Sequence, residues 1–147
     1  MTIEEIEQEI IEEFEMFEDW MQRYEHLIDL GKSMPMIEEK HKTEDKLIKG
    51  CQSQVWMHSE LKDACLPDRQ GKIFYTADSD AIITKGMVAL MIRVLSNHTP
   101  QEIIDSKLDF IEKIGLTKHL SPTRSNGLLS MIKQMKLDAL AYKNKLV

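Results

Sequence analysis

One segment of the chain, residues 81–95, is apolar on nearly every side when it is arranged as a helix. Such a helix must be covered on all of its faces, so we expect it to be the central, buried helix of the fold. A few polar residues interrupt the segment, and it is too short and too polar to cross a bilayer. Just before it, Asp78, Ser79 and Asp80 offer short acceptor side chains and negative charge, which favour capping of its N-terminus.

The first thirty residues also carry a helical pattern. Thr2 and Glu5 form the sequence signature of a capping box. The apolar residues that follow are spaced alternately by three and four, which indicates an amphipathic helix. We expect the pattern to end at Gly31, just after a helix C-terminus. It fits one long helix, or two helices with a break near residues 15–19.

The middle of the chain changes character. Residues 36–46 are charged and show no period, which predicts an exposed connector. Residues 47–49 are expected to form a short strand. Residues 54–61 and 72–77 are expected to form two further strands, joined by a long loop with turn-forming residues at 67–71.

The C-terminal part returns to helices. Residues 99–102 form a second capping box with proline at the first helical position, and another short helix is expected over 108–114. Residues 121–127 are interpreted as a loop before a terminal amphipathic helix that begins near Leu128. The order of elements predicts one α+β domain over residues 1–147, with a small antiparallel sheet of about three strands packed against helices.

Charge and cysteine content narrow the function. The net charge of −6 argues against binding to nucleic acid. The first residues show neither the basic nor the apolar part of a secretory signal, so we expect a cytoplasmic protein whose two cysteines, Cys51 and Cys65, are reduced thiols. Two cysteines form neither a disulfide scaffold nor a four-ligand zinc site.

Cys51 is oddly placed for a core cysteine. It follows Gly50 directly and precedes the polar residues Gln52, Ser53 and Gln54, whereas core cysteines usually lie within apolar periodic segments. Gly50 tolerates a positive φ, so the backbone can turn sharply there and present or withdraw the sulfur.

The run from Gly50 to Trp56, GCQSQVW, resembles the cysteine motif of the SufE-type sulfur acceptors. Other blocks that resemble the family follow in the same order between about Phe17 and the C-terminal helix. They are Leu30-Gly31-Lys32, Asp78-Ser79-Asp80-Ala81, Lys85-Gly86, Thr99-Pro100, Leu116 and the stretch HLSPTRSNG at 119–127.

The resemblance implies a fold like that of the IscU-type scaffolds and a sulfurtransferase accessory protein that stimulates a cysteine desulfurase. The acceptor thiol would be Cys51. It would take a persulfide sulfur from a SufS-type desulfurase, or from one of the CsdA pathway, and pass it to a SufBCD-type scaffold. A thiolate that attacks the outer sulfur of a persulfide needs neither metal nor organic cofactor, and the chain shows no motif for one.

Several other residues are candidates for support of the site. Gln52 and Gln54 either donate hydrogen bonds to the sulfur or only close the turn. Asp80 is most simply a helix-capping residue, with a hold on the cysteine loop or contact with the desulfurase as the alternatives. Arg124 either meets a carboxylate of a partner or braces the loop. Cys65, in the hairpin loop, is interpreted as a loop thiol, with a resolving partner for Cys51 as the sharper alternative.

Two other functions remain open at this point. A cysteine-dependent hydrolase would pair Cys51 with a histidine such as His119, but no local motif supplies the oriented pair and the oxyanion hole. A scaffold that holds an iron–sulfur cluster or another metal would need about three or four thiolate-type ligands, and the motif contains one cysteine.

Overall fold

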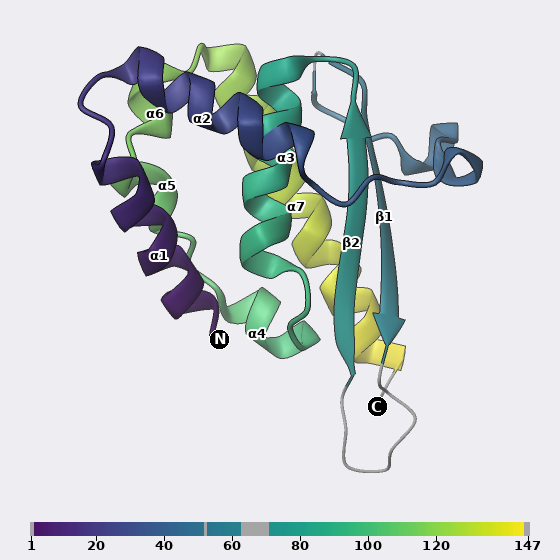
Figure 1. Cartoon of the computed structure of the whole chain (residues 1–147). Helices are drawn as coiled ribbons and strands as arrows, with labels where there is room; N and C mark the ends of the chain where they lie inside the picture. The colour runs from purple at the N-terminus through teal and green to yellow at the C-terminus, as the bar shows by residue number, and fades with distance from the viewer. Residues whose placement is uncertain (1, 52, 63–70, 146–147) are drawn as a thin grey trace.

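The computed structural model describes residues 2–51, 53–62 and 71–145 (Figure 1). This part of the chain has an α+β architecture, with seven α-helices and a two-stranded antiparallel sheet. The elements are α1 (Ile3–Glu15), α2 (Trp20–Lys32), the 3₁₀ turns η1 (Glu39–His41) and η2 (Glu44–Lys46), β1 (Val55–Lys62), β2 (Lys72–Ser79), α3 (Ile82–Leu95), α4 (Pro100–Asp105), α5 (Phe110–Lys113), α6 (Leu116–His119) and α7 (Pro122–Lys145).

Helix α3 lies at the centre of the molecule, as predicted. It contacts α1, α2, α7 and β2, and Figure 1 shows α2 on one side of it and the hairpin on the other. Most of its residues are buried, including Val88, Leu90 and Leu95. At about 25 cal/mol per Å² of apolar surface removed from water, burial of these side chains makes a substantial contribution to core stability.

Helices α2 and α3 cross at a pair of glycines. A Cβ atom on Gly86 would overlap the carbonyl oxygen of Leu27 and lie 2.8 Å from its carbonyl carbon. A Cβ on Gly31 would lie 2.9 Å from the backbone nitrogen of Gly86. The prediction that Gly31 follows the end of the helix is therefore wrong. Gly31 is the penultimate residue of α2, and its small size serves the close approach to α3.

The N-terminal residues form two helices and not one long helix, so the second of the two predicted alternatives is correct. Helix α1 ends at Glu15, and Asp19 caps α2 by accepting a hydrogen bond from the backbone of Gln22 at 2.8 Å. The capping box at Thr2 and Glu5 is confirmed. The break lets the chain reverse direction, so that α1 and α2 both face α3 (Figure 1).

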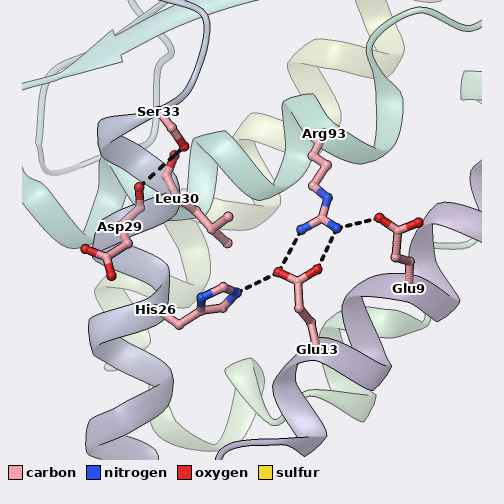
Figure 2. Close-up of polar contacts among 7 residues, drawn as sticks. All are labelled: Glu9, Glu13, His26, Asp29, Leu30, Ser33 and Arg93. Atoms are coloured by element: carbon pink, nitrogen blue, oxygen red, sulfur yellow. Dashed lines mark hydrogen bonds and ion pairs between the residues drawn. The ribbon is translucent and has the colours of Figure 1, made fainter.

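A polar cluster joins these three helices (Figure 2). Glu13 of α1 accepts hydrogen bonds from Arg93 of α3 at 3.0 and 2.6 Å, and its Oε1 lies 2.7 Å from Nε2 of His26 of α2. Arg93 also donates to Glu9 at 2.8 Å. The bonds from Arg93, reinforced by His26, outweigh burial and hold the pKa of Glu13 below its usual value. The cluster thus gives hydrogen-bond partners to Arg93, the arginine that interrupts the apolar segment.

The hairpin has one face in the core and one face outside. Val55 pairs with Ser79 and Lys62 with Lys72 across the two strands. On the inner face, Tyr75 is buried, and its hydroxyl donates to the carbonyl of Met135 in α7 at 2.8 Å. That contact fixes the sheet against α7.

Two predictions for the segment before the hairpin need correction. Residues 47–49 form no third strand, and the sheet contact there is a single bridge between Leu47 and Trp56. Residues 36–46 lack an α-helix or strand, as expected, but they are not simply an exposed connector. Ile37 is buried, and Lys42 pairs with Asp78 of β2 at 2.8 Å. The strand pairing stops after the bridge at Leu47, because the chain turns at Gly50, which has φ of +93°, and enters the cysteine loop.

The loop predicted over residues 121–127 is also wrong, because α7 already begins at Pro122. The Oγ of Ser121 accepts a hydrogen bond from the backbone of Arg124 at 3.3 Å, and Ser125 donates to the carbonyl of Ser121 at 2.9 Å. A serine followed by proline is the start signal of a helix. Thr99 and Pro100 form the same start signal at α4, where the predicted capping box is confirmed.

The remaining helices are short. The segment expected over 108–114 forms α5, and Gly115, with φ of +85°, separates it from α6. Within the described residues, no helix has both the length and the apolar character needed to cross a membrane.

The close crossing of α2 and α3 generates a stability prediction. Gly86→Ala should lower the free energy of unfolding by about 1–3 kcal/mol, because the new methyl group meets backbone atoms that cannot rotate away. This outweighs the gain of about 1 kcal/mol that alanine brings to a helix interior. Urea denaturation measures the difference.

Gly127→Ala is the matched control for that measurement. A Cβ there meets its nearest atom, Sγ of Cys51, at 3.5 Å, which is an ordinary contact. We expect this helical substitution to leave the free energy of unfolding unchanged or to raise it. Equal losses for both variants would contradict the steric explanation.

Candidate functional site

Cys51 lies on a tight loop between η2 and β1. Gly50 has φ of +93°, and a Cβ atom there would overlap the Oγ of Ser130 in α7. A side chain at position 50 would therefore be strained and would push the loop off α7. The positive φ that glycine permits at this position is observed. The close approach to α7 is a second reason for glycine there, which the sequence did not indicate.

The thiol of Cys51 is free and half-buried. Its Sγ donates a hydrogen bond to the carbonyl oxygen of Gly127 in α7, at a sulfur–oxygen distance of 3.5 Å. Burial raises the pKa of the thiol above its usual value. A thiol with a raised pKa is mostly protonated at neutral pH, so the sulfur at rest is a poor nucleophile.

The far side of the loop is attached to the start of α3 through Asp80. Its Oδ1 accepts a hydrogen bond from the backbone of Gln54 at 3.0 Å, and its backbone donates to the carbonyl of Gln54 at 3.3 Å. The Oγ of Ser79 donates to the same carbonyl at 2.8 Å. Of the roles weighed for Asp80, the structure shows the hold on the cysteine loop.

Asp78 and Asp80 do not cap α3, contrary to the prediction. The N-cap residue is Ala81, without a side-chain hydrogen bond. Asp78 instead accepts from Lys42 and lies 3.3 Å from Lys85. Burial pushes the pKa of Asp78 upward, but the hydrogen bonds from Lys42, the Ser79 backbone and Lys85 prevail and lower it. Lys85, one of the two charged residues within α3, thus pairs with a carboxylate of β2.

A cavity of about 720 Å³ opens beside the thiol. Its walls come from the cysteine loop, the beginning of α3 and the first turns of α7. Cys51, Asp80 and Arg124 all line it, so the structure brings together three residues that lie far apart in the sequence. Ile82, also in the lining, is 65% exposed. The cavity therefore combines a sulfur, a carboxylate, a guanidinium and an accessible apolar side chain.

The other candidates have different places. The side chain of Gln54 is exposed, and this residue acts through its backbone. Gln52 and Cys65 lie outside the described residues, so the alternatives for them stay open. His119 stacks on Trp20 with ring centroids 4.1 Å apart. Neither it nor any other histidine is among the described residues that line the cavity, which leaves the hydrolase hypothesis without its base.

Metal-ligand side chains do not gather around Cys51 in the described part of the chain. Within residues 2–51, 53–62 and 71–145, the group of histidine and acidic side chains close enough to share an ion lies elsewhere and does not include Cys51. This arrangement offers no support for a cluster scaffold at the thiol.

Sequence reasoning missed two contributors to the site. The carbonyl of Gly127 carries no side-chain signal, so only the tertiary structure reveals it. The helical start at Ser121 was recognisable from the serine–proline pair, and it determines where Arg124 lies: in the first turn of α7, not in a loop.

The SufE family model, described as "Fe-S metabolism associated domain", matches residues 8–139. An uncharacterized SufE-like protein of Synechocystis is 39% identical over 133 residues, which cover 90% of this chain and 79% of that protein. An uncharacterized SufE-like protein of Rhizobium meliloti is 38% identical over 133 residues, which cover 89% of this chain and 92% of that protein.

Two further comparisons extend the likeness. SufE-like protein 1, chloroplastic/mitochondrial, of Arabidopsis thaliana is 37% identical over 90% of this chain, which covers 34% of that protein. The solution structure of a hypothetical protein from Thermus thermophilus superposes with a TM-score of 0.73 over 93% of this chain and 95% of that chain. Its sequence identity is 16%, so this likeness concerns the fold alone.

The burial of Cys51 generates a prediction about its reactivity. Alkylation by iodoacetamide proceeds through the thiolate, so the pH midpoint of the native reaction should lie above that of the unfolded chain, and the native rate at neutral pH should be lower. Asp80→Ala removes the loop's anchor on α3 and should raise the rate and move the midpoint back toward the ordinary value. Peptide mapping by mass spectrometry separates Cys51 from Cys65.

Asp29→Ala is the control, since Asp29 is an exposed carboxylate on α2. It should leave the rate at Cys51 unchanged. A native midpoint equal to that of the unfolded chain would contradict the effect of burial, and equal rates for the two aspartate variants would contradict the role of Asp80.

Proposed function

The chain belongs to the SufE family, which is associated with iron–sulfur metabolism, and from this premise we propose that it accepts a persulfide sulfur on Cys51. The donor is a cysteine desulfurase of the SufS type, and the receiver is a cluster-assembly scaffold of the SufBCD type. The observation that carries the proposal is a free, half-buried thiol on a glycine-turned loop at the edge of an open cavity.

The transfer step needs only the two proteins. The Cys51 thiolate attacks the outer sulfur of the donor persulfide, the bond between the two donor sulfurs breaks, and the donor cysteine leaves as a thiolate. Cys51 then carries the sulfur as a persulfide, with no net oxidation. The reaction exchanges one sulfur–sulfur bond for another, so a small thiol could remove the sulfur from Cys51 in the same way. In a reducing compartment such as the cytoplasm, the persulfide must therefore be shielded from small thiols.

The resting state of the site fits an accessory role. With its pKa raised and its hydrogen bond to Gly127, the thiol is held protonated and partly covered. Contact with a partner must therefore release the loop and ionise the sulfur before transfer. That requirement would confine the reaction to the complex and limit loss of sulfur to free thiols.

The surface beside the thiol has the features of a docking site for the desulfurase. Ile82, at the start of α3, is 65% exposed. Arg124 lines the same cavity and is exposed, and no carboxylate among the described residues forms an ion pair with it. An exposed apolar side chain beside an unpaired guanidinium favours a partner surface that supplies a carboxylate.

Cys51→Ser tests the proposed function. Incubated with an active cysteine desulfurase, pyridoxal phosphate and free cysteine, the wild-type protein should gain the mass of one or more sulfur atoms on the peptide that contains Cys51. A reducing thiol should remove that mass. The serine variant should gain none, because an alcohol does not form a persulfide, while its circular dichroism and thermal unfolding stay those of the wild type.

Cys65→Ser is the matched control for the adduct and should behave like the wild type. If the sulfur maps to Cys65 alone, or if the Cys51→Ser variant still stimulates the desulfurase fully, Cys51 is not the acceptor.

Arg124→Ala tests the docking surface. Loss of the guanidinium should weaken the affinity for the desulfurase, measured by titration calorimetry, by about three- to tenfold, as expected for one exposed charge at an interface. The free energy of unfolding should change by less than about 0.5 kcal/mol, because the side chain is exposed.

Lys107→Ala removes another exposed cation, next to α4, and should leave the affinity unchanged. Unchanged affinity for Arg124→Ala together with a large loss of stability would mean that Arg124 only braces the cysteine loop.

A further inference from the structure

The outer face of the hairpin carries a second group of reactive side chains. His58 and Glu60 are two residues apart on β1, so their side chains lie on the same face of the strand. His41, from η1, covers His58, and the two imidazole rings stack with centroids 3.7 Å apart and planes 8° apart. The 3₁₀ turn thus places one histidine directly over another.

These three side chains are close enough to share one ion. One ligand atom from each of His41, His58 and Glu60 lies within 4.8 Å of the others. Nε2 of His58 and Oε1 of Glu60 are 3.0 Å apart. Two ligands at about 2.0–2.1 Å from a tetrahedral ion are separated by about 3.3 Å, close to the spacing of this pair. The ring of His41 must tilt out of its stack on His58 to bind, because one ion cannot lie in the planes of two parallel rings.

His58 is largely enclosed, and one of its two ring nitrogens faces Glu60. Its Nδ1 atom is buried, so Nε2, 3.0 Å from Oε1 of Glu60, is the nitrogen placed to reach an ion. The side chain as a whole is 15% exposed, and a small cavity of about 160 Å³ opens beside it, lined in part by His41, Glu60 and Glu38.

We propose that His41, His58 and Glu60 bind a single divalent ion of the zinc type. Two imidazoles and one carboxylate are a donor set that zinc takes with a fourth position left to water or another ligand, and imidazole favours zinc-like ions over magnesium or calcium. One charge opposes binding: Nζ of Lys62 lies 3.9 Å from Oε2 of Glu60. That lysine is 55% exposed and can turn into solvent.

The site would add a further link between two segments of the chain. His41 belongs to the 36–46 segment, whose other ties to the hairpin include the ion pair of Lys42 with Asp78. His58 belongs to the strand that starts directly after the cysteine loop. None of the residues that line the small cavity lines the cavity at Cys51, so the metal site is independent of the proposed sulfur transfer.

Zinc binding to tag-free full-length protein tests the proposal. The protein should carry Cys51→Ser and Cys65→Ser, so that no thiol competes for the metal. Competition with a chromophoric chelator should give one bound Zn²⁺ per chain. His58→Gln and, separately, His41→Gln should each weaken the affinity at least about tenfold, the smallest loss expected when even an outer-sphere partner of a metal is removed.

His119→Gln is the matched control, since this histidine stacks on Trp20 in the helical part of the molecule. It should bind zinc as the parent does. Circular dichroism confirms that each variant is folded, and ring ¹⁵N signals of His41 and His58 should shift on zinc addition while those of His119 stay. The proposal is overturned if the parent binds no stoichiometric zinc, or if the three glutamine variants bind alike.

Discussion

The burial of α3 on all sides is the constraint on which the rest of the structure depends. A helix with apolar side chains around its whole circumference must be enclosed, and α1, α2, α7 and β2 provide the enclosure. Two charged residues lie near its ends, and each forms an ion pair: Lys85 with Asp78 and Arg93 with Glu13. The glycine at position 86 lets α2 approach closely enough to close one side.

The same enclosure builds the site around Cys51. The start of α3 holds one end of the cysteine loop through Asp80, and the first turns of α7 cover the other through the Gly127 carbonyl. A thiol held between two rigid elements is protected and poorly ionised at rest. Under the proposed function, this cover would protect a persulfide on Cys51 from small thiols, and a partner that displaces the loop would restore the reactivity of the sulfur.

The hairpin separates two regions of different chemistry. Its inner face anchors on α7 through Tyr75. Its outer face is covered by the 36–46 segment, which brings Lys42 to Asp78 and His41 to His58. A segment that looked like a solvent-exposed connector is therefore held by electrostatic and ring contacts, and charged residues without a period give no sign of such contacts in advance.

The sequence by itself determined the central helix, the hairpin, the capping boxes and the identity of the family, because apolar period, turn chemistry and the motif around Cys51 are local properties. It also contained the serine–proline start of α7, although residues 121–127 are predicted from the sequence to form a loop. Only the tertiary structure decided that Gly31 meets Gly86, that Asp80 holds Gln54 and that the thiol is half-buried. These depend on contacts between residues distant in the chain, where packing overrides local preference.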